Sequence, residues 1–375
     1  MKRSLQPRES SWRAMKLRSA AGPDKGSQSA GAQVTAGCGR GSGRALRAGK
    51  ISRSKMVSRI VWFLPWLCAC GALPGFVPGH TFGGRHGPLR AAKSSPAVCV
   101  AAGGACAEYC SFPARADGAR IDAYWYRPQA ARMDSDSAAV LVFTDVYGVR
   151  DDHNRAWIGA FAEASGLPVF APDLFRGVPW NESKFGGDTS SPQYEAWRRE
   201  HYVPGRVLCD MADSAQFALS SLCAGKQKLA AVGFCFGGGR LLEAIAGDTS
   251  SSNRLWSRLA AAVAFYPTRL ADTASVRTGL AASAVPILIV QGDRDPISPS
   301  SLASAVGCPR SPSPIPADCL RASLLFEGRK HGFVHRECNS KNDDAATDAK
   351  LALDESVLWT LRFLRTMPDR GKPIL

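Results

Sequence analysis

A single cysteine stands between glycines in "VGFCFGGGR", the stretch from Val232 to Arg240. The apolar run 228–234 before it predicts a buried strand, and 237–247 after it predicts a helix. Glycines two residues on either side of Cys235 suit a sharp strand-to-helix turn, where side chains would collide with backbone. The helix N-terminus would then favour the thiolate. The segment predicts Cys235 as a nucleophile, and the alternative is a buried thiol in a tight turn.

A nucleophilic cysteine needs a base, and in strand-turn-helix sites of this kind an acid and a histidine follow in chain order. Two histidines lie downstream, His331 in "GRKHGF" and His335. We favour His331, because it follows the apolar run 323–328 between two glycines. The segment "VQGDRDPISP" offers Asp293 and Asp295, and we favour Asp295, which stands before a proline.

The surrounding elements place these three side chains at the ends of strands. Apolar runs predict strands at 121–128, 138–144, 167–173, 228–234, 259–267, 285–292 and 323–328. Helices are predicted at 151–166, 205–222, 237–247 and about 343–365, with Asp151 and Asp152 as candidate N-caps and Gly166 as the stop. The run 121–128 alternates like an edge strand, and the polar, aromatic-dotted segment 176–204 could form a cap. The alternation predicts an α/β fold, a mostly parallel sheet with helices on both faces that binds ligands at the strands' carboxyl ends.

Charge divides the 375 residues into two parts. Residues 1–107 hold 17 of the 47 Lys and Arg but only two acidic residues, so 30 basic and 30 acidic residues remain for 108–375. The net charge of +15 therefore belongs to the leader and not to the predicted domain at 108–375. The leader buries too little apolar surface to fold alone. Nucleic-acid binding is disfavoured, because no aromatic residues interleave with its arginines.

The leader resembles a targeting segment. Arg59 precedes an apolar run at 60–73, which is signal-peptide-like and too short for a comfortable membrane span. A basic, hydroxylated, acid-free stretch beginning with Phe76 follows, like a transit peptide. The combination resembles the bipartite leaders of proteins sent to complex plastids, so we favour a plastid. The alternatives are secretion, mitochondrial import, or a cytoplasmic location if the leader is mis-annotated and translation starts at Met56.

Five motifs together resemble the dienelactone hydrolase family of the α/β-hydrolase superfamily: "TDVYGV", "APDLF", "GFCFGG", "GDRDPISP" and "HGF", within about residues 120–366. The resemblance implies Cys235 as nucleophile, His331 as general base and acid, and Asp295 as the group that holds the imidazole tautomer. It also implies an oxyanion hole formed by the backbone N–H groups of Phe236 and Val146.

The resemblance also identifies candidates around the nucleophile. Asp145 stands where the family usually has a glutamate that pairs with the resting thiol and takes part in its activation. The family's arginine before "YEAW" is missing here, and its second clamp position falls on His335, next to Arg336. Tyr147 and Trp197 are further candidates for contact with substrate, and Arg198 and Arg199 are possible substitutes for the clamp.

These features predict a hydrolase of carboxylic esters or lactones, similar to a carboxymethylenebutenolidase, that works through an acyl-thioester without metal or cofactor. The alternatives are a thioesterase, a small-ester detoxifying enzyme, or a non-catalytic scaffold that binds a ligand or partner. The expected partner is a small-molecule ester or lactone, with no nucleic acid and no stable membrane span. Monomer and homodimer both remain open, as does a disulfide between Cys308 and Cys319 in an oxidising compartment.

Overall fold

The computed structural model describes residues 105–130, 137–181, 190–222, 227–248, 254–270, 273–338 and 343–367. The segments predicted to direct targeting, including the apolar run 60–73, lie outside these residues. Strand β1 already includes Cys106 and Ala107, which the composition had assigned to the leader.

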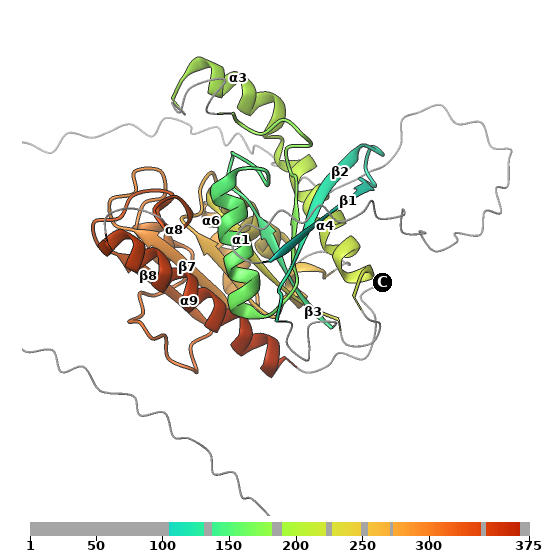
Figure 1. Cartoon of the computed structure of the whole chain (residues 1–375). Coiled ribbons are helices and arrows are strands. Elements are labelled where there is room, and N and C mark those ends of the chain that lie inside the picture. The colour runs from blue at the N-terminus through green and yellow to red at the C-terminus, as the bar shows by residue number, and fades with distance from the viewer. Residues whose placement is uncertain are drawn as a thin grey trace, which may run out of the picture. The chain divides into compact units, whose positions relative to one another are not determined.

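Eight strands form one sheet (Figure 1). They are β1 (Cys106–Pro113), β2 (Arg120–Arg127), β3 (Ala138–Phe143), β4 (Val169–Pro172), β5 (Lys228–Phe234), β6 (Ala262–Phe265), β7 (Ile287–Gly292) and β8 (Arg321–Phe326). Their order is β1-β2-β4-β3-β5-β6-β7-β8, and all neighbours from β4 to β8 are parallel. The mostly parallel sheet predicted from the sequence is confirmed.

The position predicted for residues 121–128 is wrong. Strand β2 is not at an edge, because β1 pairs with it antiparallel along its full length, and β4 pairs with its other side. The alternation of β2 arises because its two faces differ in burial, which does not depend on its place in the sheet. Strand β1, "CAEYCSFP", was not anticipated. Polar residues interrupt its apolar pattern, and it is held partly by cross-strand ring contact between Tyr109 and Tyr124.

Helices cover both faces of the sheet. Helices α1 (Asp152–Ser165) and α9 (Asp343–Thr366) belong to one apolar cluster and lie together over one face in Figure 1. Helices α4 (Pro204–Ser220), α5 (Cys235–Gly247) and α6 (Thr273–Ala282) pack against the other face. Alternate side chains of β3 enter the two clusters, Val140 on the side of α1 and Leu141 on the side of α4, as a strand between two helical layers requires.

The local signals predicted for α1 are confirmed. Asp151 is the N-cap and accepts a hydrogen bond from Asn154 N, and Gly166 ends the helix in the left-handed conformation at φ 67°. Helix α5 begins at Cys235, two residues earlier than its predicted start. Short helices α7 (Ser301–Ala305) and α8 (Phe333–Arg336) complete the strand-end loops near the site.

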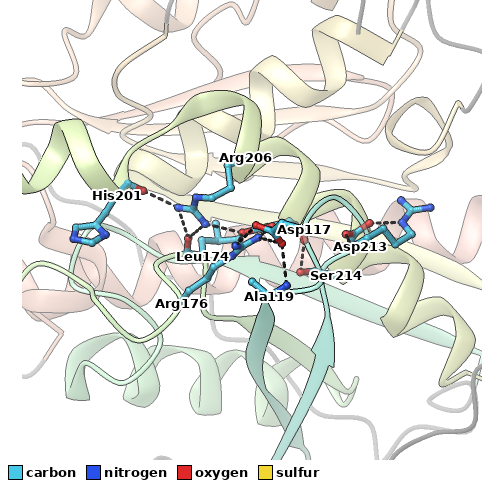
Figure 2. Close-up of polar contacts among 10 residues, drawn as sticks. Asp117, Ala119, Leu174, Arg176, His201, Arg206, Asp213 and Ser214 are labelled. Atoms are coloured by element: carbon cyan, nitrogen blue, oxygen red, sulfur yellow. Dashed lines mark hydrogen bonds and ion pairs between the residues drawn. The ribbon is translucent and has the colours of Figure 1, made fainter. Parts of the chain in front are cut away.

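The cap region contains helix α3 (Pro192–His201), which the sequence pattern left without an element. Arg206 at the start of α4 donates to the carbonyls of Leu174 and His201 (Figure 2). It also donates to Asp210. Arg176 also binds Asp210, whose side chain is fully buried, and reaches Asp117 in the turn between β1 and β2. This network fixes the junction between α3 and α4 to the loop that leaves the sheet at β4.

No helix among the described residues combines the length and apolarity needed to cross a membrane.

Candidate active site

Cys235 occupies the sharp turn predicted between strand β5 and helix α5. Its φ is 49°, a left-handed value that is uncommon for a residue other than glycine. A Cβ on Gly233 would stand 2.6 Å from the Gly238 Cα, and one on Gly237 would collide with the Phe143 carbonyl. Gly233 therefore lets β5 approach the start of α5, and Gly237 lets the turn pack close to β3; the sulfur is left at the N-terminus of α5.

His331 and Asp295 meet across two neighbouring loops. The imidazole Nδ1 lies 2.7 Å from Asp295 Oδ2. The other carboxylate oxygen, Oδ1, accepts the backbone N–H groups of Ile297 and Ser298 at 2.8 and 2.9 Å, which fixes the carboxylate's orientation. Arg294 N donates to Arg329 O and so ties the loop after β7 to the loop after β8.

His331 also interacts with Cys235. Burial disfavours the charged imidazole, yet the Cys235 thiolate and the Asp295 carboxylate together raise the pKa of His331 to about 10. Nδ1 is taken by Asp295, and Nε2 is buried without a hydrogen bond to nitrogen or oxygen in the described part of the chain. The three residues that the sequence selected are thus assembled, with Asp295 and Cys235 both coupled to one imidazole.

The alternatives considered for the acid and the base lie elsewhere. Asp293 accepts a hydrogen bond from Gly328 N and does not contact His331. His335 is buried at 1% exposure, with Nδ1 2.5 Å from the Tyr266 hydroxyl and Nε2 3.0 Å from Asp145 Oδ2. His335 is therefore not among the residues that line the pocket around Cys235.

Asp145 is held by partners other than the thiol. Its Oδ2 accepts from His335 Nε2 and, at 2.8 Å, from Arg336 Nη2, while Oδ1 accepts from Asn154 Nδ2 at 2.8 Å. Burial opposes its ionisation, but the hydrogen bonds and charges of His335 and Arg336 hold the pKa of Asp145 well below its usual range. Asp145 and Cys235 line the same pocket, yet Cys235 is not among the hydrogen-bond partners of Asp145 in the described chain.

The pocket has a volume of about 240 Å³ and contains Cys235 and His331. Its predicted members Asp145, Val146, Tyr147 and Arg336 are present in the lining. Arg336 stacks over Tyr147 with its guanidinium carbon 4.1 Å from the ring centroid. Trp197, in contrast, does not reach the pocket; it is buried against Phe175 and Trp180 and supports the cap from behind.

Six further lining residues were not predicted as part of the site: Tyr194, Tyr202, Thr268, Arg269, Ile297 and Gly332. The hydroxyl of Tyr202 is buried without a hydrogen-bond partner in the described chain. Thr268 Oγ1 lies 3.5 Å from Cys235 Sγ, and its backbone N donates to Cys235 O at 3.0 Å. The signal that could have found Thr268 and Arg269 is their place directly after strand β6, at the same sheet edge as the nucleophile.

The structure also shows the state of the Cys308–Cys319 pair and which groups could bind a metal. Cys308 and Cys319 are thiols in this structure and are not joined in a disulfide. Burial raises the pKa of Cys308 to about 12, and Cys319 donates to Arg321 O at 2.8 Å. Among the residues that the structure describes, no group of three or more His, Cys, Asp or Glu side chains is arranged to hold a metal ion.

Comparison with known proteins found one matching family model and several similar solved structures. The model of the dienelactone hydrolase family matches residues 121–357. A putative dienelactone hydrolase from Klebsiella pneumoniae is 18% identical, with a TM-score of 0.48 over 68% of this chain and 98% of that one. A dienelactone hydrolase-like promiscuous phosphotriesterase from metagenomic libraries is 20% identical, with a TM-score of 0.46 over 68% and 98%. An esterase from Pyrobaculum calidifontis is 15% identical, with a TM-score of 0.44 over 68% and 85%. Among curated proteins, no sequence matches.

The strand order, the turn at Cys235 and the strand-end loops define an α/β hydrolase. Within that superfamily, this chain belongs to the dienelactone hydrolase family.

Proposed function

We propose that this chain hydrolyses carboxylic esters or lactones with Cys235 as nucleophile, His331 as general base and acid, and Asp295 as the group that orients the imidazole. The observation that carries the proposal is the imidazole of His331, which binds Asp295 at 2.7 Å and is electrostatically coupled to the cysteine at the sharp turn. A nucleophile, a base and an orienting carboxylate in this order are the parts that acyl transfer needs.

The proposed reaction has two steps. The Cys235 thiolate, whose proton lies on His331, forms a bond to the substrate carbonyl carbon, and the carbonyl π pair moves onto oxygen. That tetrahedral intermediate collapses, the carbon–oxygen bond to the alkoxide leaving group breaks, and His331 gives its proton to that oxygen. Water then attacks the acyl-thioester, His331 takes a proton from the water, and the Cys235 thiolate leaves. In a lactone the alkoxide stays tethered and the product is a hydroxy acid or its tautomer.

The negative charge that develops on the substrate carbonyl oxygen needs hydrogen-bond donors to stabilise it. Phe236 follows the nucleophile in the first turn of α5, and Val146 belongs to the turn after β3 and lines the pocket. Their backbone N–H groups are the proposed oxyanion hole. A donor in such a site typically contributes about 3 kcal/mol to the transition state.

The pocket supports a small substrate with a polar or anionic group. Its 240 Å³ volume and aromatic lining by Tyr147, Tyr194 and Tyr202 suit a compact ester or lactone. Two arginines, Arg269 and Arg336, line the pocket. Arg336 is paired with Asp145 and Asp151, so the exposed Arg269 is the one that favours a negative substrate group. The chemistry requires no metal or organic cofactor.

The test is turnover of a panel of p-nitrophenyl esters, acyl-thioesters and dienelactones by the full chain. Cys235→Ala and His331→Ala should each abolish turnover of the preferred substrate, while His153→Ala, an exposed position on α1, should not. Preference for thioesters would support a thioesterase. Equal rates in all four proteins would contradict the enzymatic proposal and favour a ligand-binding scaffold.

The leader is proposed to direct the chain to an organelle, with a plastid favoured. The support is its composition and the apolar run at 60–73. A fusion of residues 56–107 to a fluorescent reporter should reach an organelle, and a purely cytosolic signal would contradict targeting.

A further inference from the structure

A second buried chain of polar groups lies beside the proposed triad and takes no part in the reaction as written. The Tyr266 hydroxyl is 2.5 Å from His335 Nδ1, and His335 Nε2 is 3.0 Å from Asp145 Oδ2. Tyr266, His335 and Asp145 are 0%, 1% and 3% exposed. A buried, fully connected polar chain costs desolvation energy and fixes geometry in return, so each member is expected to have a structural consequence.

The hydrogen bonds that link Tyr266, His335 and Asp145 all donate in the same direction, toward Asp145. Asp145 is held as the anion, so its Oδ2 accepts and the His335 proton must reside on Nε2. Nδ1 then carries the lone pair and accepts from the Tyr266 hydroxyl. Burial lowers the pKa of His335, which agrees with a neutral imidazole in this single tautomer.

One end of the chain controls a turn of the proposed oxyanion hole. Asp145 Oδ1 accepts from Tyr147 N at 3.1 Å, and Asp145 O accepts from Gly148 N at 3.1 Å. Val146 lies inside this turn, and its carbonyl accepts from Trp180 N at 2.9 Å. The direction of the Val146 N–H therefore depends on how the Asp145 carboxylate is held.

The other end of the chain reaches the nucleophile. Tyr266 has a left-handed φ of 34° and packs edge-on to the His331 ring, with centroids 4.8 Å apart. Two residues later, Thr268 N donates to Cys235 O. A strained backbone conformation persists only where surrounding contacts determine it, and here those contacts include the ring of the proposed base His331 and the hydrogen bond to His335.

We propose that His335 is a positioning residue. Through the hydrogen-bonded chain Tyr266–His335–Asp145, it orients the Val146 N–H relative to the Phe236 N–H in the oxyanion hole. The inference rests on the proposed function, because it assigns a role within that oxyanion hole. Loss of His335 would leave Oδ2 of Asp145 with Arg336 as its partner, while Oδ1 keeps Asn154 Nδ2 and Tyr147 N. The carboxylate would then be drawn toward Arg336, and the turn that carries the Val146 N–H would shift with it.

The experiment compares His335→Phe, His335→Gln and the exposed control His153→Phe in the full chain, with a p-nitrophenyl ester as substrate. Misplacement of one donor should lower the kcat of His335→Phe about 10- to 100-fold, with KM nearly unchanged. His335→Gln keeps an amide donor for Asp145 and should recover most of the loss. Iodoacetamide should alkylate Cys235 at the wild-type rate in all three variants.

A purely structural role predicts a different pattern. If kcat of His335→Phe equals that of wild type, or if alkylation of Cys235 slows in parallel with kcat, the assignment to the oxyanion hole is wrong. If His335→Phe does not fold, Tyr266→Phe removes one hydroxyl only and should lower kcat in the same direction, and an unchanged kcat overturns the proposal.

A readout independent of turnover separates this inference from the proposed function. Amide hydrogen exchange at Tyr147, whose N–H is bonded to Asp145, should be faster in His335→Phe than in wild type or His153→Phe. Wild-type protein without esterase activity contradicts the proposed function, whereas unchanged exchange at Tyr147 contradicts the positioning role itself.

Discussion

Arg336 donates to Asp145 across 2.8 Å, within the lining of the pocket that contains the candidate nucleophile. Arg336 also lies 3.7 Å from Asp151, so its charge is already balanced by two carboxylates in the resting structure. Arg269, from the loop after β6, lines the same pocket and is exposed. The pocket therefore has one arginine that is held by the protein and another that faces solvent.

This difference predicts how the two charges affect substrate choice. Arg269→Gln should raise KM about tenfold for an ester that carries a carboxylate, because a charge-assisted hydrogen bond is lost. KM for a neutral p-nitrophenyl ester should not change. Arg277→Gln, an exposed position on helix α6, is the matched control. Equal effects on charged and neutral esters would show that Arg269 does not select for charge.

Asp295 is expected to act through the imidazole and not through substrate. Asp295→Asn should lower kcat on the order of 10³- to 10⁴-fold, because the amide no longer holds the His331 tautomer. Asp293→Asn, two residues away and bonded to Gly328 N, should stay within a factor of a few. Steady-state kinetics of the two variants decides between the two aspartates, and a larger loss in Asp293→Asn would reverse the assignment.

The pKa of His331 should depend on the charge of the neighbouring Cys235 sulfur. The pKa of His331 is raised to about 10 against the opposing effect of burial, and the charge of Cys235 is the largest cause of that rise. In Cys235→Ser, histidine NMR titration should show that the pKa of His331 has fallen. An unchanged titration midpoint would mean that the two groups are not coupled.

The raised pKa of His331 also makes the free energy of unfolding depend on pH. Because the folded pKa of His331 lies above the ordinary 6.5, protonation of His331 stabilises the fold fully below pH 6.5, and the contribution disappears as the pH rises toward 10. Denaturant unfolding of wild type should lose more stability across this interval than that of Cys235→Ser.

The sequence predicted those parts of the site that depend on local pattern. Glycines around Cys235 have a steric reason that is visible in the sequence alone, and Asp295 and His331 follow apolar runs at strand ends. The structure brings all three residues to one edge of the sheet, as the order of parallel strands requires. Strand β1 and helix α3 were missed because their own patterns are weak: β1 is held by pairing with β2, and α3 by ring packing of Tyr194 against Trp180.

Partners that depend on tertiary contacts were not predictable. Asp145 and His335 are 190 residues apart, and no spacing rule joins them. The motif alone paired Asp145 with the thiol, whereas in the structure its carboxylate faces His335, Arg336 and Asn154. Trp197 was chosen as an aromatic residue of the cap, but its side chain packs inward against Phe175.

The arginine network behind the cap should be a determinant of stability. Asp210 is fully buried and accepts from both Arg176 and Arg206. Asp210→Asn removes the charge that both guanidinium groups need, and loss of one member of a buried ion-pair network typically costs about 3 to 5 kcal/mol. Asp354→Asn, in an exposed pair with Lys350, should cost less than about 1 kcal/mol. Urea unfolding measures both, and equal losses would contradict a special role for the network.

The proposed reaction requires a covalent bond between the acyl group and Cys235. The full chain should be mixed with a p-nitrophenyl ester, quenched in acid within the first turnover, digested, and analysed by peptide mass spectrometry. The peptide containing Cys235 should gain the mass of the acyl group, and neutral hydroxylamine should remove it, as expected for a thioester. Release of p-nitrophenol without an acyl group on Cys235, or with the same acyl adduct in Cys235→Ala, would contradict the proposed reaction.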